Sequence, residues 1–403
     1  MTFNKADKCI DAIGVGVVGL GRAFMLTRPD FEGDARFNLV AACDTRAEAR
    51  DSFSTRYSAA AYSDVEKLAA DPSVEAVYIA SPHQLHEAHA ITALTADKHV
   101  LIEKPIAIKL SASRAIIEAA AVSKGSVIVG PSHSFDPQIE ACLDIVKSEE
   151  FGRLRMIRTS YYTDFMYRPR RPEEMRTEDG GGVVFSQAVH QVDIVRLLAG
   201  GLTKQVFSHT GDWDEKRPTE GAYTALLKFE NGISANLHYS GYAHYDTDAA
   251  FSWMSELGMK KDPAQYGAAR KLLRTVNGKS EGDLKNQRMF GSAVNFQDVS
   301  GNEHFGELTL TFDHADIRVT PQMLEIYGED HIRSEPVLPV IGRRSNVLSA
   351  LWGLVRENKA PVQDGRWGHA TLEVCHGILS SGRSGEVQIM REQVPVPGYP
   401  ATT

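Results

Sequence analysis

The sequence contains little cysteine. Its 403 residues include four cysteines, at positions 9, 43, 142 and 375, which are far apart and form no C-x-x-C pair. A disulfide framework and a cysteine zinc site both need closely spaced cysteines, so we expect neither. The thiols are expected to be reduced and packed as small hydrophobic side chains.

Long apolar runs are also missing. No segment approaches the roughly 18 apolar residues needed to span a bilayer, and residues 1–12 lack the apolar core of a secretion signal. We therefore expect a cytoplasmic protein without a membrane segment. The formal net charge of -8 gives no general attraction to nucleic acid or to an anionic membrane. Neither partner is expected, and any positively charged binding site must be local.

The length predicts more than one domain. A single hydrophobic core stops growing at roughly 250 to 300 residues, and this chain has 403 residues. We therefore expect two domains.

Two overlapping glycine patterns occupy residues 13–24, IGVGVVGLGRAF. A dinucleotide-binding turn follows a buried parallel strand and opens directly into a helix. If the turn began at Gly14, the strand would contain Asp11 and the helix would start with β-branched residues. If it begins at Gly19, the strand is the apolar AIGVGVV and the helix starts near Arg22. We prefer the second pattern, in which Phe24 stands where a glycine or alanine is usual.

An acidic residue follows at the expected distance. The next predicted strand, FNLVAACD, ends at Asp44, about 20 residues beyond the turn, as the dinucleotide fingerprint requires. A carboxylate there accepts hydrogen bonds from the adenosine ribose and repels a 2′-phosphate. We therefore expect NAD as the cofactor, with a preference over NADP that Arg46 would weaken. The alternative is a glycine-rich strand that binds no nucleotide.

Strand and helix patterns alternate up to residue 131. Strands separated by helices form a parallel sheet with helices on both faces, and ligands bind beyond the carboxyl ends of its strands. We predict an α/β Rossmann domain with a doubly wound parallel sheet over residues 1–131. The residues in the turn and at the predicted strand ends are Gly19, Leu20, Gly21, Arg22, Asp44, Ser81, Pro82, His83, Glu103, Lys104 and His133.

The pattern changes after residue 131. Alternating and aromatic-rich runs follow, and ENGIS at 230–234 contains the Asn-Gly signal of a hairpin. We predict a substrate-binding and oligomerisation domain over residues 132–403, of the α+β class with a large, mostly antiparallel open sheet. Residues 246–300 are polar and helix-prone, which indicates an insertion that is either a lid or an oligomer arm.

Several stretches resemble one protein family when they are taken together. The GLGRAF turn, Asp44, SPHQLH at 81–86, EKP at 103–105 and GGGVVFSQAVHQVD at 180–193 resemble the glucose-fructose oxidoreductase and inositol dehydrogenase (Gfo/Idh/MocA) family. Residues 364–386 resemble that family's returning carboxy-terminal helix.

A subgroup of the family is still more similar. YIASPHQ, YRPRRPEE and RPTEGAY closely resemble its dehydrogenases of carboxylated cis-dihydrodiols. The resemblance implies NAD-linked oxidation of a cyclohexadiene cis-diol carrying two carboxylates to a catechol, in aromatic degradation. It also implies a homodimer or homotetramer, because the open sheet in this family commonly packs against a second subunit.

Two residues are candidate catalysts. Lys104 follows a predicted strand at the ligand edge, and a lysine in a partly dry cleft can have its pKa lowered enough to exchange protons near neutrality. His190 is the second candidate because histidine titrates near the working pH. The resemblance places an aspartate where Ser186 stands, so the choice between the lysine and the histidine stays open. Glu103 is expected to support Lys104 or the nicotinamide ribose.

The loop at 81–86 contains two histidines, His83 and His86. They are three residues apart, but a catalytic zinc site needs three protein ligands, and no third ligand accompanies them. We therefore expect no metal. The resemblance puts this loop against the nicotinamide ribose and pyrophosphate, which makes Ser81, Pro82 and both histidines candidate cofactor contacts. For His86 the alternative is a helix-start residue that touches no ligand.

An arginine-rich loop indicates an anionic substrate. Arg168, Arg170 and Arg171 alternate with prolines in YRPRRPEE. Arginine binds carboxylates through paired hydrogen bonds, so we expect one or two of the three to contact a small dicarboxylate cis-diol. The alternative is a solvated loop paired with its own glutamates. His133 and Tyr167 are further candidate substrate contacts.

Three functions fit these patterns. The first is an NAD-dependent cis-dihydrodiol dehydrogenase. The second is another enzyme on the same scaffold, acting on a sugar, a polyol or a different carboxylated cyclic alcohol. The third is a regulatory protein that senses the nucleotide. The arginine loop argues against a neutral sugar, and the presence of both Lys104 and His190 argues against a sensor.

Overall fold

A computed structural model describes residues 11–276, 278–286, 289–290, 301–338 and 344–400. It contains two compact units, each assembled from separate parts of the chain. The first unit consists of Met1–Pro131, Asn286–Asn295 and Arg344–His369. The second consists of Ser132–Lys285, Phe296–Arg343 and Ala370–Thr403.

The first unit contains a parallel sheet of six strands. Their order is β3 (Ala60–Tyr62), β2 (Phe37–Cys43), β1 (Ile13–Val18), β4 (Ala76–Ile79), β5 (His99–Ile102) and β6 (Val127–Val129). Every neighbouring pair is parallel. The predicted doubly wound parallel sheet is therefore confirmed. Its helices are α1 (Arg22–Gly33), α2 (Ala47–Tyr57), α3 (Val65–Ala69), α4 (His86–Thr95) and α5 (Leu110–Val122), with α10 (Ser345–Glu357) from later in the chain.

The central strands are apolar because they are covered on both faces. All six residues of β1 and all four of β4 are buried, as expected for parallel strands between two helix layers. In α2 the buried residues are Ala49 and Phe53, four positions apart, so the helix has a single narrow face toward the core.

Two later segments join the first unit through specific side chains. Phe290 packs edge-on against Phe24, with 5.4 Å between the ring centroids. In α10, Arg356 makes two hydrogen bonds with the carboxylate of Glu75, of 2.8 and 3.0 Å. These contacts explain why the first unit extends beyond the continuous range 1–131.

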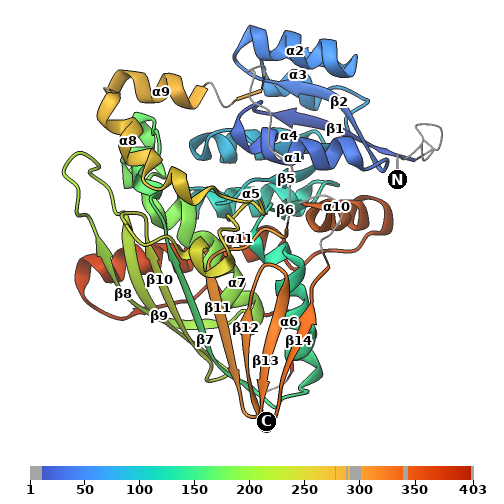
Figure 1. The fold of residues 1–403 in the computed structure, drawn as a ribbon. Coiled ribbons are helices and arrows are strands. Elements are labelled where there is room, and N and C mark those ends of the chain that lie inside the picture. The colour runs from blue at the N-terminus through green and yellow to red at the C-terminus, as the bar shows by residue number, and fades with distance from the viewer. Residues whose placement is uncertain (1–10, 277, 287–288, 291–300, 339–343, 401–403) are drawn as a thin grey trace. The chain divides into compact units, whose positions relative to one another are not determined.

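The second unit contains a sheet of nine strands. Their order is β14 (Ile332–Pro336), β13 (Met323–Gly328), β12 (Ala315–Val319), β11 (Glu307–Phe312), β7 (Leu154–Tyr162), β10 (Ser234–Ser240), β9 (Ala222–Phe229), β8 (Thr203–Gly211) and β15 (Gln388–Ile389). In Figure 1 the strands can be followed in sheet order from β8 at one side to β14 at the other. Only the pair β10 and β7 is parallel among these neighbours, which confirms the predicted mostly antiparallel sheet. Alternate residues of β9 are buried, as in a sheet with one covered face.

Helices cover the buried face of this sheet. They are α6 (Pro137–Ser148), α7 (Val189–Leu198) and α11 (Gly365–Ser384), the last of which starts within the first unit. Gln191 of α7 donates to Thr159 of β7 at 3.0 Å, and Ser208 of β8 donates to the Ile378 carbonyl of α11 at 2.6 Å. The predicted insertion contains α8 (Ala268–Thr275) and α9 (Gly278–Asn286); residues 291–300 lie outside the described part.

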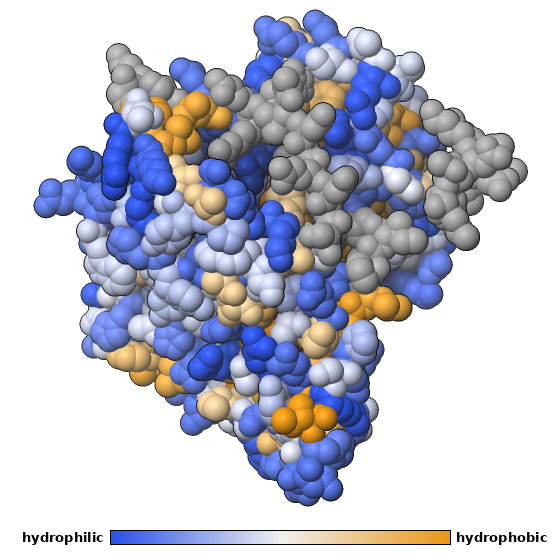
Figure 2. Space-filling model, in the orientation of Figure 1, coloured by the Kyte–Doolittle hydropathy of each residue, from blue (hydrophilic) through white to orange (hydrophobic). Residues whose placement is uncertain are grey.

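Among the described residues, no helix is long and apolar enough to cross a membrane. The face of the molecule seen in Figure 2 is mainly hydrophilic, with small separate hydrophobic groups.

Candidate active site

The second glycine pattern forms the turn between β1 and α1. Gly19 follows the strand with a φ of +92°, and a Cβ there would lie 2.8 Å from the Ala80 carbonyl oxygen. Only glycine accepts both conditions. Gly14 lies inside β1, where a Cβ would lie 2.0 Å from the Ser73 carbonyl oxygen. The first pattern therefore serves close packing of the strand.

The start of α1 fits the pyrophosphate of a dinucleotide. Gly21 is the N-cap residue and provides no side-chain cap to the helix. The first N–H groups of a helix bind anions, and the helix dipole favours negative charge at this end. The residues present in the turn thus fit NAD.

Asp44 lies at the end of β2 and is closely held. Its carboxylate accepts the Leu20 N–H at 2.8 Å, which ties it to the glycine turn. Arg46 donates to it through its backbone N–H at 2.9 Å and through Nε and Nη2, both at 3.1 Å. The arginine therefore partly neutralises the carboxylate that was predicted to select NAD.

His86 has a positioning role in this structure. It is fully buried, and its two ring nitrogens lie 2.9 Å from the Pro105 carbonyl oxygen and 3.0 Å from that of Ser81. Burial lowers its pKa to about 4. The side chain connects two candidate cofactor loops, and its nitrogens face backbone rather than a ligand. Of the predicted loop residues, Pro82 is exposed and His83 is half-buried.

Glu103 and Lys104 follow β5. The Glu103 carboxylate is buried and accepts the Tyr78 hydroxyl at 2.7 Å, with Arg344 Nη1 at 3.6 Å. Burial, the largest influence, raises its pKa despite the opposing effects of Arg344 and Tyr78. Glu103 is therefore held within the first unit, beside Lys104, whose charge also acts on it. Lys104 is half-buried.

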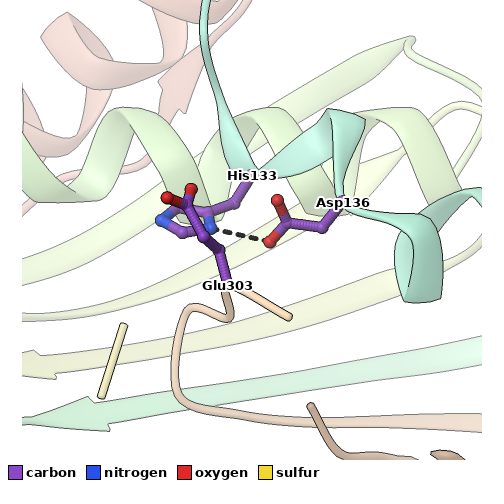
Figure 3. Close-up of side chains that lie close together, drawn as sticks. All are labelled: His133, Asp136 and Glu303. Carbon is purple, nitrogen blue, oxygen red and sulfur yellow. Dashed lines mark hydrogen bonds and ion pairs between the residues drawn. The ribbon is translucent and has the colours of Figure 1, made fainter. Parts of the chain in front are cut away.

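In the second unit, three buried side chains point toward one another (Figure 3). His133 Nδ1 lies 2.7 Å from Asp136 Oδ2, and Glu303 approaches from a separate segment. The three ligand atoms all lie within 4.8 Å of one another, a distance at which such groups can hold a metal ion. The short bond makes His133 and Asp136 a hydrogen-bonded pair. The sequence analysis missed both carboxylates: Asp136 lies three residues after His133 in HSFD, which is a local signal that could have found it, whereas Glu303 gave no sequence signal.

His190 lies beside this group. It is the second residue of α7, which follows a π-helical turn, Val184–Ala188, a feature common at functional sites. The ring centroids of His190 and His133 are 4.8 Å apart in an edge-to-face arrangement, and Phe305 contacts both rings. Ser186 donates its hydroxyl to the Gly182 carbonyl, so it serves the helix backbone.

The three predicted arginines have different surroundings. Arg168 lies 3.4 Å from both Asp164 and Glu256, and these carboxylates raise its pKa against the opposing effect of burial. Arg170 stacks on the Phe165 ring at 3.6 Å and donates to the Phe165 carbonyl at 2.7 Å. Burial, followed by the charges of Arg168 and Arg217, lowers its pKa to about 10 despite Glu174.

The insertion contributes charged groups to the arginine loop. Glu281 of α9 accepts two hydrogen bonds from Arg217, of 2.9 and 3.0 Å, and one from the Arg170 backbone N–H at 3.0 Å. Lys285 of α9 pairs with Glu174, whose carboxylate also accepts the Arg171 N–H at 2.9 Å. Burial is the main cause that lowers the pKa of Lys285, opposed by Glu174. The sequence did not indicate Glu281 and Lys285, whereas Glu174 is one of the loop's own glutamates in the alternative interpretation.

Tyr167 precedes the arginine loop in a 3-10 turn, Phe165–Tyr167. The guanidinium of Arg270, from α8, lies 4.2 Å from its ring centroid, and Arg270 also donates to the carbonyls of Tyr242 and Ala243. The ring therefore anchors the insertion in addition to any contact with substrate.

Comparison with known proteins defines the class. Residues 13–131 match the family model described as an oxidoreductase family with an NAD-binding Rossmann fold, and residues 139–259 match the GFO/IDH/MocA C-terminal domain. The chain belongs to the Gfo/Idh/MocA family and is an NAD-binding oxidoreductase.

Individual relatives match the chain with different identities and over different lengths. The chain is 43% identical over 379 residues to the 1-carboxy-3-chloro-3,4-dihydroxycyclohexa-1,5-diene dehydrogenase of Comamonas testosteroni, covering 92% of this chain and 94% of that one. It is 26% identical to the trans-1,2-dihydrobenzene-1,2-diol dehydrogenase of Bos taurus, over 50% and 59% of the two chains. A solved structure of a putative dehydrogenase from Bordetella bronchiseptica is 35% identical with a TM-score of 0.90, covering 94% of this chain and all of that one.

Proposed function

We propose that the protein is an NAD-dependent dehydrogenase that oxidises cis-4,5-dihydroxy-4,5-dihydrophthalate to 4,5-dihydroxyphthalate in aromatic degradation. The relative from Comamonas testosteroni supports the general class, because its name describes a carboxylated dihydroxycyclohexadiene as substrate. Similarity across nearly the whole of both chains favours a substrate of the same kind.

One observation in the structure carries the proposal, namely the surroundings of the Arg170 guanidinium. It donates to the Phe165 carbonyl at 2.7 Å and stacks on the Phe165 ring at 3.6 Å, and neither contact supplies negative charge. Glu174 favours the charge of Arg170, but burial and the neighbouring charges of Arg168 and Arg217 oppose it. A buried charge without full compensation is costly. A substrate carboxylate would supply compensation, whereas a neutral sugar would not.

Arg170 is the arginine best suited to bind a substrate carboxylate. Arg168 already has Asp164 and Glu256 as partners, so an anion would have to compete with them. Arg170 has a lowered pKa, which means that its surroundings disfavour its charge. An incoming carboxylate removes that penalty and can form charge-assisted hydrogen bonds with the guanidinium.

The reaction requires an acceptor for the hydroxyl proton while the carbon-bound hydride leaves. NAD, when bound in the first unit, supplies the hydride acceptor. We assign Lys104 as the acceptor of the hydroxyl proton. We assign His190 to a proton transfer within the second unit. The two residues belong to different units of the chain.

A second candidate substrate is a cis-diol with a single carboxylate and a chlorine, as in the name of the Comamonas relative. Such a substrate offers the arginine loop one carboxylate instead of two, so we expect it to be used less efficiently.

A substrate panel tests the proposal. Formation of NADH is measured with the phthalate cis-dihydrodiol, a monocarboxylated cis-dihydrodiol, an uncarboxylated cis-dihydrodiol and inositol. We expect kcat/KM to fall in that order. Higher kcat/KM with inositol than with any diol would refute the assignment. Higher kcat/KM with the monocarboxylated diol than with the phthalate cis-dihydrodiol would favour the second candidate substrate.

A further inference from the structure

Two imidazoles and two carboxylates form one buried group in the second unit. His133, Asp136, Glu303 and His190 are each no more than 8% exposed. His133 bonds Asp136 at 2.7 Å, and its ring meets that of His190 edge to face. Figure 3 shows that His133 and Asp136 come from one turn, while Glu303 reaches them from elsewhere in the chain.

The two imidazoles have unequal surroundings. Charged or titratable groups act on His133 from several elements: Asp136 on its own turn, His190 on α7, Glu303 and His304 before β11, and Glu256. Burial, the largest effect, disfavours its protonation, but Asp136, Glu303 and Glu256 together raise its pKa above the usual value. Carboxylates thus favour the charged form of His133.

The proposed reaction contains a second proton step, and this inference rests on the proposed function. Hydride loss from one carbinol carbon and proton loss from its hydroxyl produce a hydroxydienone. The ring becomes aromatic only when the neighbouring carbinol carbon loses its C–H proton and the carbonyl oxygen gains one. No electrons are exchanged in this tautomerisation. It needs a base and an acid that act on neighbouring atoms.

We propose that His190 and His133 are the base and the acid of this aromatising step. Neutral His190 accepts the proton from the carbinol carbon, and protonated His133 donates the proton of Nε2 to the carbonyl oxygen. Asp136 is a positioning residue that holds His133 through Nδ1 and maintains its charge. A proton then passes from His190 back to His133, which restores both rings and leaves no net change.

The test follows the two products separately in a single turnover with excess NAD. NADH reports hydride loss, and catechol absorbance reports aromatisation. In the wild-type protein both signals should rise together. Asp136→Asn keeps the shape but removes the charge, so NADH should still form while catechol formation lags by about 100-fold, as expected for loss of an acid–base group. Asp144→Asn, at an exposed position of α6, is the matched control and should show no lag.

The pH dependence separates this role from a structural one. The charged form of His133 is present below its pKa, which Asp136 raises, so aromatisation should slow as pH rises through that value. Removal of the carboxylate lowers the pKa, and the decline should move to lower pH in Asp136→Asn.

Several results would overturn the inference. These are coincident NADH and catechol signals in Asp136→Asn, a lag with an unshifted pH profile, and loss of both signals together with a lower unfolding temperature. Loss of wild-type aromatisation on chelation and its return with zinc would assign His133, Asp136 and Glu303 to a metal instead. Failure of the proposed function is distinguishable, because wild-type protein would then form no NADH from the diol.

Discussion

At the residue scale, we propose that Asp44 and Arg46 set the preference of the first unit between NAD and NADP. Arg46 makes three hydrogen bonds to the Asp44 carboxylate. The partly neutralised carboxylate can still accept hydrogen bonds from a ribose, while the guanidinium would be released to bind a 2′-phosphate if the carboxylate were removed.

We therefore predict that the wild-type enzyme prefers NAD and that Asp44→Ala narrows the preference, because Arg46 is then released toward the 2′-phosphate of NADP. The measurement is kcat/KM for both cofactors. The double variant Asp44→Ala/Arg46→Ala should lose the gain with NADP. A wild-type preference for NADP would contradict this assignment.

Lys104 provides the second prediction at this scale. Lys104→Met should reduce turnover by roughly 100-fold or more, because a positioned acid–base group is lost, while NAD binding should stay nearly unchanged. Turnover and NAD affinity are measured together, with Lys109→Met as a control at an exposed nearby lysine. A wild-type rate in Lys104→Met would make His190 the leading proton acceptor.

Sequence reasoning reaches some of these residues and misses others for physical reasons. Gly19 and Asp44 were predictable because a tight turn and a strand end impose local constraints. Glu303 was not, because tertiary packing alone brings it to His133. For His86 the sequence left a cofactor contact and a helix-start residue both open. His86 is the first residue of α4, and its ring bonds the carbonyls of Pro105 and Ser81.

At the element scale, ion pairs and hydrogen bonds connect α9 of the insertion to the arginine loop and its neighbours. Arg217 and Glu281 pair through two hydrogen bonds, with only 7% and 13% of their side chains exposed. Removing one partner of a buried pair leaves the other charge uncompensated.

We predict that Glu281→Gln lowers the free energy of unfolding by about 3 kcal/mol and raises KM for the carboxylated diol more than it changes kcat. Urea unfolding and steady-state kinetics provide the two measurements. Arg333→Ala removes an ion pair with Glu150 whose side chains are 38% and 43% exposed, so it should cost less than about 1 kcal/mol. An equal loss of unfolding free energy in the two variants would contradict a stabilising role for the buried pair of Arg217 and Glu281.

The helices and strands were more predictable from the sequence than the distant segments that pack against them. The parallel strands were readable because strands covered on both faces are continuously apolar, and the second sheet because its strands alternate. Phe24 departed from the glycine or alanine expected after the turn. The structure explains the departure, because Phe24 packs against Phe53 and Phe290, and Phe290 is 266 positions further along than Phe24 in a segment that no local pattern connects to α1.

At the scale of the whole molecule, we propose that the exposed face of the second sheet is a self-association interface. Met156 and Tyr162 of β7 and Leu226 of β9 are 41%, 37% and 46% exposed, on strands that bury other residues in the core. Exposed apolar groups on one sheet face are typical of an interface.

We predict a homodimer or homotetramer of the 44.3 kDa chain and a shift toward monomer in Leu226→Glu, because the new charge would be buried without a partner. Light scattering after size exclusion gives the mass. Lys147→Glu, at an exposed position of α6 in the helix layer, controls for added negative charge away from the exposed sheet face. A monomeric wild-type protein would contradict a subunit interface on the exposed face of the second sheet.

The recognition of a substrate carboxylate by Arg170 is the central claim, and kcat/KM of Arg170→Ala with carboxylated and uncarboxylated cis-dihydrodiols tests it most directly. Truncation leaves the bound carboxylate without its partner, so the phthalate cis-dihydrodiol should lose about 2 to 4 kcal/mol of transition-state binding, while the uncarboxylated diol should change little. Arg170→Lys keeps the charge without the paired donors and should recover part of the loss. Equal losses on both substrates would mean that Arg170 supports the fold rather than reading the carboxylate.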